Sequence, residues 1–165
     1  MNQTKFLVLF LILPIITIGQ DRDLSAFRPL VDKTWVAEGK WENGTEFKQE
    51  VNFHYDLDNS IVIANSKGFV NQEQTKYGPR NHGVRQYDKA SKSFKFWEFD
   101  VFGNVTTGTV VFQGKNILYH YKYGDLMMTD MWEYVDESIY NFKVGIYANG
   151  NWEQYYLNTV FKAKK

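Results

Sequence analysis

Three residues of one segment, His82, Arg85 and Tyr87, have side chains that can bind a polar ligand. Residues two apart on a β-strand project from the same face, so Arg85 and Tyr87 point the same way. Directed inward, they would form a cationic, hydroxyl-bearing end in an aromatic lumen, which suits a ligand carboxylate. A buried guanidinium needs a partner, and an internal one such as Glu98 would make Arg85 structural. Outward placement of Arg85 and Tyr87 is the open alternative.

Further candidate ligand contacts come from two later segments. Tyr119 and Tyr121 share one strand face, and Met128 and Trp132 share another. Aromatic rings fill wide space and Tyr or Trp offers a polar tip, while Met adapts to varied apolar shapes. Ordinary core packing is the alternative for each of them. The candidate ligand-binding set is His82, Arg85, Tyr87, Tyr119, Tyr121, Met128 and Trp132.

The sequence predicts no catalytic residue, metal site or cofactor. It contains no nucleophile elbow, phosphate-binding glycine loop or zinc-protease helix. The histidines, His54, His82 and His120, lie far apart, and none has a second His or Cys at metal-ligand spacing. Iron ligation by Tyr155 or Tyr156 is the alternative that remains.

Acidic residues within expected strands are the other route to an enzyme: Glu98, Asp130, Glu133 and Glu153. Two carboxyl groups act as an acid and base pair on a sugar when they are about 5 to 10 Å apart. Sequence spacing does not bring these residues together. The favoured interpretation is that they are charges on the outer strand faces, where they discourage aggregation.

Turn-forming residues at short intervals after Val31 predict a series of β-strands. Such short connections join neighbours antiparallel, and closing the meander removes its two edges. The chain is therefore predicted to be all-β, a closed antiparallel up-and-down barrel of about ten strands with a short N-terminal helical turn within 21–31. A β-sandwich is the alternative. The expected strands are 34–41, 45–55, 60–66, 69–75, 82–87, 93–101, 105–113, 116–123, 126–135, 138–147 and 151–162, with 60–66 and 69–75 possible as one bent strand.

The segment 46–55 alternates clearly between apolar and polar residues. This pattern predicts an inward face and an outward face for one strand. The residues expected on the inward face are Phe47, Gln49, Val51, Phe53 and Tyr55.

A turn is expected at 77–79, which reads Tyr-Gly-Pro.

Residues 1–19 have the pattern of a secretory signal peptide, in which Lys5 precedes an apolar run. A membrane anchor is the alternative, but Pro14 interrupts the run, which is shorter than the roughly 20 residues of a spanning helix. We expect cleavage before Gln20, a secreted or periplasmic protein, and no stable membrane insertion after cleavage.

Residues 20–165 fit a single domain. The chain has no Cys, so its stability must come from packing and hydrogen-bonded strands. Acidic and basic residues balance at 19 each, and nothing favours a nucleic-acid partner. Aromatic residues are abundant, with 11 Tyr, 13 Phe and 5 Trp, and they favour strands.

A helical lead-in, Trp35 at the first strand and a meander with late basic residues make the chain similar to the calycin group, including secreted bacterial lipocalin-like domains. Lipocalins carry Gly-X-Trp at this place, and here the tripeptide is Lys33-Thr34-Trp35. The resemblance implies that Trp35 is buried at one end of the barrel near the last strand, with Lys162 or Lys164 as its basic partner. It implies the fold more strongly than any activity.

Three functions remain open on the sequence. The leading one is an exported protein that holds a small hydrophobic or amphipathic molecule in the lumen, with an acidic ligand where Arg85 is not neutralised by the protein. An interior filled with side chains would exclude it. The second is a glycan- or protein-interaction module with a solid barrel and exposed aromatic residues. The third is an enzyme, which requires two inward carboxyl groups facing one cavity.

Overall fold

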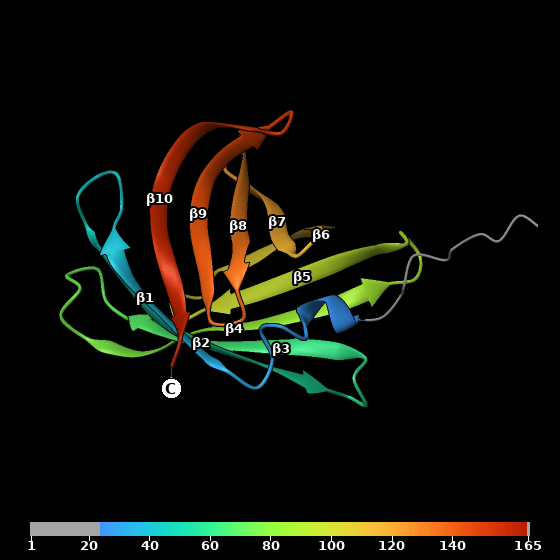
Figure 1. The fold of residues 1–165 in the computed structure, drawn as a ribbon. Coiled ribbons are helices and arrows are strands. Elements are labelled where there is room, and N and C mark those ends of the chain that lie inside the picture. Colours follow the sequence, from blue (N-terminus) through green and yellow to red (C-terminus); the bar gives the residue numbers. More distant parts are fainter. Residues whose placement is uncertain (1–23, 165) are drawn as a thin grey trace, which may run out of the picture.

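A computed structural model describes residues 24–164, which form a 3-10 turn followed by ten strands (Figure 1). The elements are η1 (Leu24–Phe27), β1 (Thr34–Lys40), β2 (Glu46–Asp56), β3 (Ile61–Phe69), β4 (Tyr77–Asp88), β5 (Ser93–Asp100), β6 (Val105–Gln113), β7 (Asn116–Tyr123), β8 (Leu126–Asp136), β9 (Ile139–Ala148) and β10 (Asn151–Ala163). The expected signal peptide lies outside the described residues.

Each strand pairs antiparallel with its neighbour in the sequence, and β1 also pairs with β10. The register there places Trp35 opposite Ala163, which closes the barrel. The predicted all-β, up-and-down barrel is therefore confirmed, and the β-sandwich is excluded. The alternation expected for 46–55 is also confirmed, since Val51 and Phe53 are buried in the core while Lys48 faces outward to Glu38.

The N-terminal turn covers one end of the barrel. Phe27 and Leu30 are fully buried, and the Phe27 ring packs edge-on against Phe112 with 5.1 Å between centroids. The Tyr55 hydroxyl donates a hydrogen bond to the Leu24 carbonyl, 3.1 Å away. The η1 segment lies across the end where β4 and β5 join (Figure 1). One mouth of the barrel is thereby plugged.

Trp35 is fully buried at this plugged end, beside the last strand, as predicted. Its indole nitrogen donates to the Leu30 carbonyl at 2.9 Å, which ties the lead-in segment to β1. The basic partner differs from the expectation. Lys33 places its ammonium 5.5 Å from the Trp35 ring centroid, whereas Lys164 pairs with Glu50 and Lys162 is exposed. The cation therefore comes from the residue two positions before the tryptophan.

The β3–β4 connection lies earlier than the sequence predicted. Residues 69–75 form no strand beyond Phe69, and the expected turn at 77–79 belongs to β4. Asn71 organises the actual loop, because its side-chain oxygen accepts hydrogen bonds from the amides of Thr75 and Lys76. Pro79 is accommodated in β4 because it lies at a register shift, where the ladder is already irregular.

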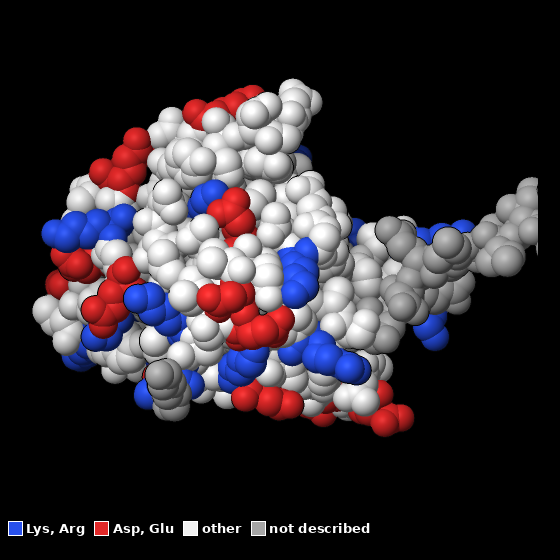
Figure 2. Space-filling model, viewed as in Figure 1, with Lys and Arg blue, Asp and Glu red and all other residues white. Residues whose placement is uncertain are grey.

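Acidic and basic side chains interleave on the face of the molecule shown in Figure 2. This distribution agrees with the equal numbers of acidic and basic residues in the chain. Within 24–164, no helix has the length and apolar character needed to cross a membrane.

Candidate functional site

The barrel interior is not filled completely by side chains, and it holds a cavity of about 270 Å³. Ligand pockets typically start at about 300 Å³, so this cavity lies just below the usual range and has room only for a small molecule. One part of its wall is apolar and aromatic, formed by Val51, Phe53, Ala64, Phe96, Trp132 and Phe142. The other part is polar, formed by Gln49, Asn81, Arg85, Glu98, Thr106 and Asp130 with Tyr119, Tyr121 and Tyr123.

Arg85 projects from β4 into this lumen and is 6% exposed. Its Nη2 lies 2.9 Å from a Glu98 carboxylate oxygen, and its Nε donates to the Tyr119 hydroxyl at 3.3 Å. Burial acts to lower the pKa of Arg85, but Tyr119 and Glu98 together raise it, so the guanidinium stays charged. Glu98 therefore fills the role that makes Arg85 structural.

The ion pair lies directly over Gly83, the residue two positions before Arg85 on the same strand face. A Cβ at this position would overlap Arg85 Nη1 and the Glu98 carboxylate. The absence of a side chain at Gly83 thus makes the space in which the two charged groups meet.

Asp130 is a second inward carboxyl group, placed on β8 between Met128 and Trp132. The Tyr121 hydroxyl donates to it at 2.8 Å. Burial is the main cause that raises the pKa of Asp130 to about 7, with the nearby Glu98 carboxylate adding to the effect. Arg85 and Tyr121 act in the opposite direction, but burial outweighs them. Near neutral pH this carboxyl can therefore exist in either protonation state.

Replacing Asp130 with Asn should change how stability depends on pH. An unfolded Asp ionises near pH 4, so between about pH 4 and pH 7 only the folded barrel holds the proton. The stabilising contribution of Asp130 is full below this interval and falls by about 4 kcal/mol across it. The substituted amide would not titrate, yet its oxygen could still accept the Tyr121 hydrogen bond. Urea unfolding of both proteins from acid to alkaline pH measures the difference, and a constant difference would contradict the assignment.

Two polar atoms at the lumen wall have unmet hydrogen-bonding capacity. Arg85 Nη1, a donor, and Asn81 Oδ1, an acceptor, are buried and have no hydrogen-bond partner among residues 24–164. Such groups cost free energy when left unpaired in the interior. Arg85 and Asn81 lie on the same strand, and both residues line the cavity.

The structure brings together four of the seven residues predicted to bind a ligand. Arg85, Tyr119, Tyr121 and Trp132 all line the cavity. His82 does not, because its ring lies on the outer face of β4 and contacts the Asn65 side chain at 2.7 Å. Its position three residues before Arg85 puts it on the opposite strand face, outside the lumen.

The remaining two candidates point inward without lining the cavity. Met128 is buried in the core, and Tyr87 packs against Phe94 at 5.2 Å between ring centroids. Phe94 in turn packs on Phe112, a neighbour of the plug residue Phe27. Tyr87 therefore belongs to the aromatic packing near the plugged end.

The acidic residues divide between the two faces of the barrel. Glu98 and Asp130 line one cavity, contrary to the expectation that all such acids face outward. Glu133 binds Lys143 at 2.8 Å, and Glu153 is exposed. Among residues 24–164, no group of three or more His, Cys, Asp or Glu side chains could hold a metal ion.

The tyrosines considered as iron ligands lie elsewhere. Tyr155 is 42% exposed and stacks on Trp152 with 5.0 Å between centroids, while Tyr156 borders a separate surface hollow beside Trp41. Neither lines the lumen cavity.

Sequence reasoning missed Asn81, Thr106 and Tyr123 as cavity residues. The two-residue period carried a usable signal for Asn81, which shares a face with Gly83 and Arg85. Compared with known proteins, the chain matches no protein-family model and no curated protein sequence.

Proposed function

We propose that this protein is an exported carrier that binds a small, uncharged amphipathic molecule in its barrel lumen. The observation that carries the proposal is the pair of unpartnered atoms, Arg85 Nη1 and Asn81 Oδ1, at the wall of a cavity of about 270 Å³. A ligand whose polar end carries one accepting oxygen and one donating hydrogen would satisfy both atoms. Its oxygen would accept a hydrogen bond from Arg85 Nη1, and its hydrogen would be donated to Asn81 Oδ1. The apolar part of the molecule would pack on rings such as Phe53 and Trp132.

The ligand is uncharged because the lumen already balances its charges. Glu98 neutralises Arg85, and Asp130 carries a proton at mildly acidic pH. An acidic ligand would bring an extra anion into a space that holds two carboxyl groups, and an unpaired buried charge is costly. The preference for an acidic ligand, expected if Arg85 had no internal partner, therefore gives way to a neutral one.

Membership of the calycin group is part of the same proposal. The supporting features are the helical lead-in η1, the buried Trp35 at the plugged end and the up-and-down order of the strands. Lys33 would replace the basic residue that lipocalins supply from the last strand.

Calorimetric titration with four amphiphiles of equal chain length tests the proposal: a primary alcohol, a primary amide, a fatty acid and an alkylamine. At about pH 6 we expect the alcohol or amide to bind at least about tenfold more tightly than the acid and the amine, a difference of about 1.4 kcal/mol. Val51→Phe should fill the cavity and abolish binding. Val111→Phe is the matched control, because Val111 is 41% exposed on β6. Absence of binding by all four, or unchanged binding by Val51→Phe, would refute lumen binding.

A second candidate function is acid–base catalysis in the lumen. The observation that favours it is that Glu98 and Asp130 line one cavity in different environments, since Glu98 is paired with Arg85 whereas burial keeps a proton on Asp130. Such divergence often separates an acid from a base. The test is hydrolysis of an alcohol glycoside by the protein and by Asp130→Asn. If Asp130→Asn still binds the glycoside but no longer hydrolyses it, catalysis is favoured over a carrier function.

A further inference from the structure

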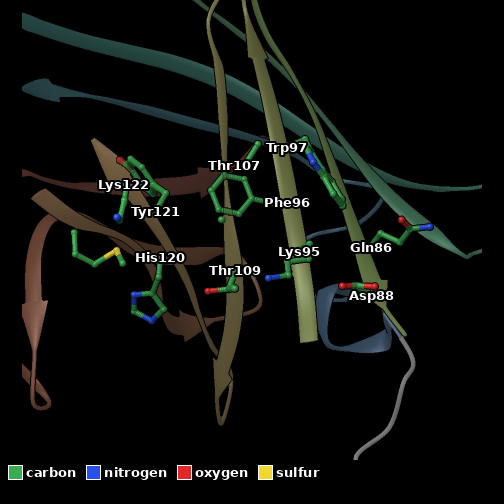
Figure 3. A pocket seen from close by; sticks show the side chains of 12 residues that line it. Gln86, Asp88, Lys95, Phe96, Trp97, Thr107, Thr109, His120, Tyr121 and Lys122 are labelled. Atoms are coloured by element: carbon green, nitrogen blue, oxygen red, sulfur yellow. The ribbon is translucent and has the colours of Figure 1, made fainter. Parts of the chain in front are cut away.

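A second hollow, distinct from the lumen, lies on the outside of the barrel. It has a volume of about 740 Å³ and is walled by residues of the five consecutive strands β4 to β8 (Figure 3). Most of these side chains point outward, and two of the lining residues, Phe96 and Tyr121, also line the lumen cavity. Figure 3 shows Thr109, Lys95 and Asp88 in a row across β6, β5 and β4. Its polar and aromatic lining includes Gln86, Lys95, Trp97, Thr107, Thr109 and Lys122.

Trp97 is the aromatic centre of this outer groove. It is half-buried on β5, with Val84 and Thr107 as its cross-strand neighbours. The other four tryptophans each pack against at least one aromatic ring, as for Trp41 on Phe47. Trp97 has no ring partner and no side-chain hydrogen bond within 24–164. Its indole face and its N–H therefore remain available to a ligand.

Two cations, Lys95 and Lys122, line the same groove as the indole. Among the described residues, Lys95 and Lys122 form no ion pair. Asp88, the acid of the groove, accepts hydrogen bonds from Ser91 and Ala90 in its own turn. These bonds lower the pKa of Asp88, and the nearby charge of Lys95 adds to the effect. Four lysines on other strands are paired: Lys40 with Glu46, Lys48 with Glu38, Lys67 with Glu50 and Lys143 with Glu133. Lys162 on β10 is exposed and forms no ion pair among the described residues.

Neutral polar groups complete the groove. The side chains of Gln86, Thr107 and Thr109 make no hydrogen bond with any residue from 24 to 164. Lys95 lies directly across the ladder from Gln86 on one side and Thr109 on the other. Donors, acceptors and a cation thus stand side by side across three strands next to the indole.

From this arrangement we propose that the outer groove binds an acidic saccharide, one that bears carboxylate or sulfate groups. The C–H face of a sugar ring would pack on Trp97, since the indole offers a wide apolar surface. The hydroxyls would exchange hydrogen bonds with Thr107, Thr109 and Gln86. The acidic groups would lie against Lys95 and Lys122, neither of which forms an ion pair among residues 24–164.

The groove fits an acidic saccharide better than a nucleic acid. Nucleic-acid binding draws most of its affinity from many phosphate contacts, commonly about six to ten in a specific complex. The outer groove offers two lysines, and the chain as a whole has no excess of positive charge. A ligand with few charges and many hydroxyls matches this composition.

Affinity electrophoresis of the full-length mature protein tests the proposal with four polymers in the gel: polygalacturonate, heparin, neutral dextran and polyglutamate. Retardation is expected with polygalacturonate or heparin, and which of the two retards more identifies carboxylate or sulfate as the acidic group. Dextran and polyglutamate should have little effect. The double variant Lys95→Gln/Lys122→Gln should bind at least about tenfold more weakly, which corresponds to a loss of about 1.4 kcal/mol of binding free energy. Lys162→Gln is the matched control, an exposed strand lysine outside the groove.

Trp97→Ala separates saccharide recognition from simple charge attraction. Both lysines remain in this variant, so retardation should fall only if a sugar ring packs on the indole. The melting temperature of each variant shows whether it has folded, and the lysine variants keep the proposal testable if Trp97→Ala does not fold. Equal retardation by polyglutamate, no effect of the lysine substitutions, or no retardation by either acidic polysaccharide would overturn the proposal. None of these outcomes depends on whether the lumen binds a ligand.

Discussion

Replacing Trp35 with alanine is expected to lower the free energy of unfolding by about 3 to 5 kcal/mol. The ring is fully buried and packs edge-on against Trp132 and Tyr140, with centroid distances of 6.2 and 5.2 Å. Truncation would leave a cavity beside these rings and remove the bond from the indole to the Leu30 carbonyl. The segment that plugs the barrel would then lose one of the hydrogen bonds that hold it in place.

Urea-induced unfolding monitored by circular dichroism measures this loss. Trp152→Ala is the control, because Trp152 lies in a surface stack with Tyr147 and Tyr155. Removing a half-buried ring of this kind should lower the free energy of unfolding less than removing a fully buried one, because less apolar surface is buried by it in the folded protein. An equal loss for both variants would show that Trp35 does not anchor the plugged end.

The barrel could be predicted from the sequence because its signals are local. Alternation along β2 separates the inward Phe53 from the outward Lys48, and short turns force antiparallel neighbours. The β3–β4 loop could not be placed, because its shape depends on side-chain bonds of Asn71 and on the register shift near Pro79. Gly78 and Pro79 usually mark a turn, but an irregular ladder tolerates them within a strand.

The polar lumen was harder to predict than the fold. Alternation places Asp130 on the same face as Met128 and Trp132, yet its charge favoured an outward position. Its inward place depends on Tyr121, which donates to it from the adjacent strand β7. Such a partnership across strands becomes visible only when the register is known. The pairing of Arg85 with Glu98 was expected as an alternative because both residue types and their opposite charges were evident from the sequence.

The two proposed sites use opposite faces of the same strands. Along β5, Glu98 turns into the lumen, where its charge is neutralised by Arg85, while Trp97 faces the outer groove. On β7, Tyr121 binds Asp130 inside, and Lys122 projects outside. Phe96 and Tyr121 line both hollows, but every substitution proposed for one site is at a residue that does not line the other. The two proposals can therefore be tested independently.

Breaking the lumen ion pair from one side should destabilise the barrel strongly. Arg85→Met keeps much of the side-chain length but leaves the Glu98 carboxylate, whose side chain is 20% exposed, without its cation. Removing one partner of a buried pair costs about 3 to 5 kcal/mol. Glu98→Met should also be costly, because the buried guanidinium of Arg85 would lose its ion-pair partner and keep only the hydrogen bond to the Tyr119 hydroxyl.

The double variant Arg85→Met/Glu98→Met distinguishes the pair from its separate members. Removing both charges leaves no uncompensated ion, and an apolar replacement of a buried pair is often neutral or stabilising. We therefore expect the double variant to be more stable than either single variant. Equilibrium unfolding of all four proteins gives the coupling energy as the departure from additivity. If the two single losses simply add, Arg85 and Glu98 act separately, and the charge balance from which a neutral ligand was inferred does not exist.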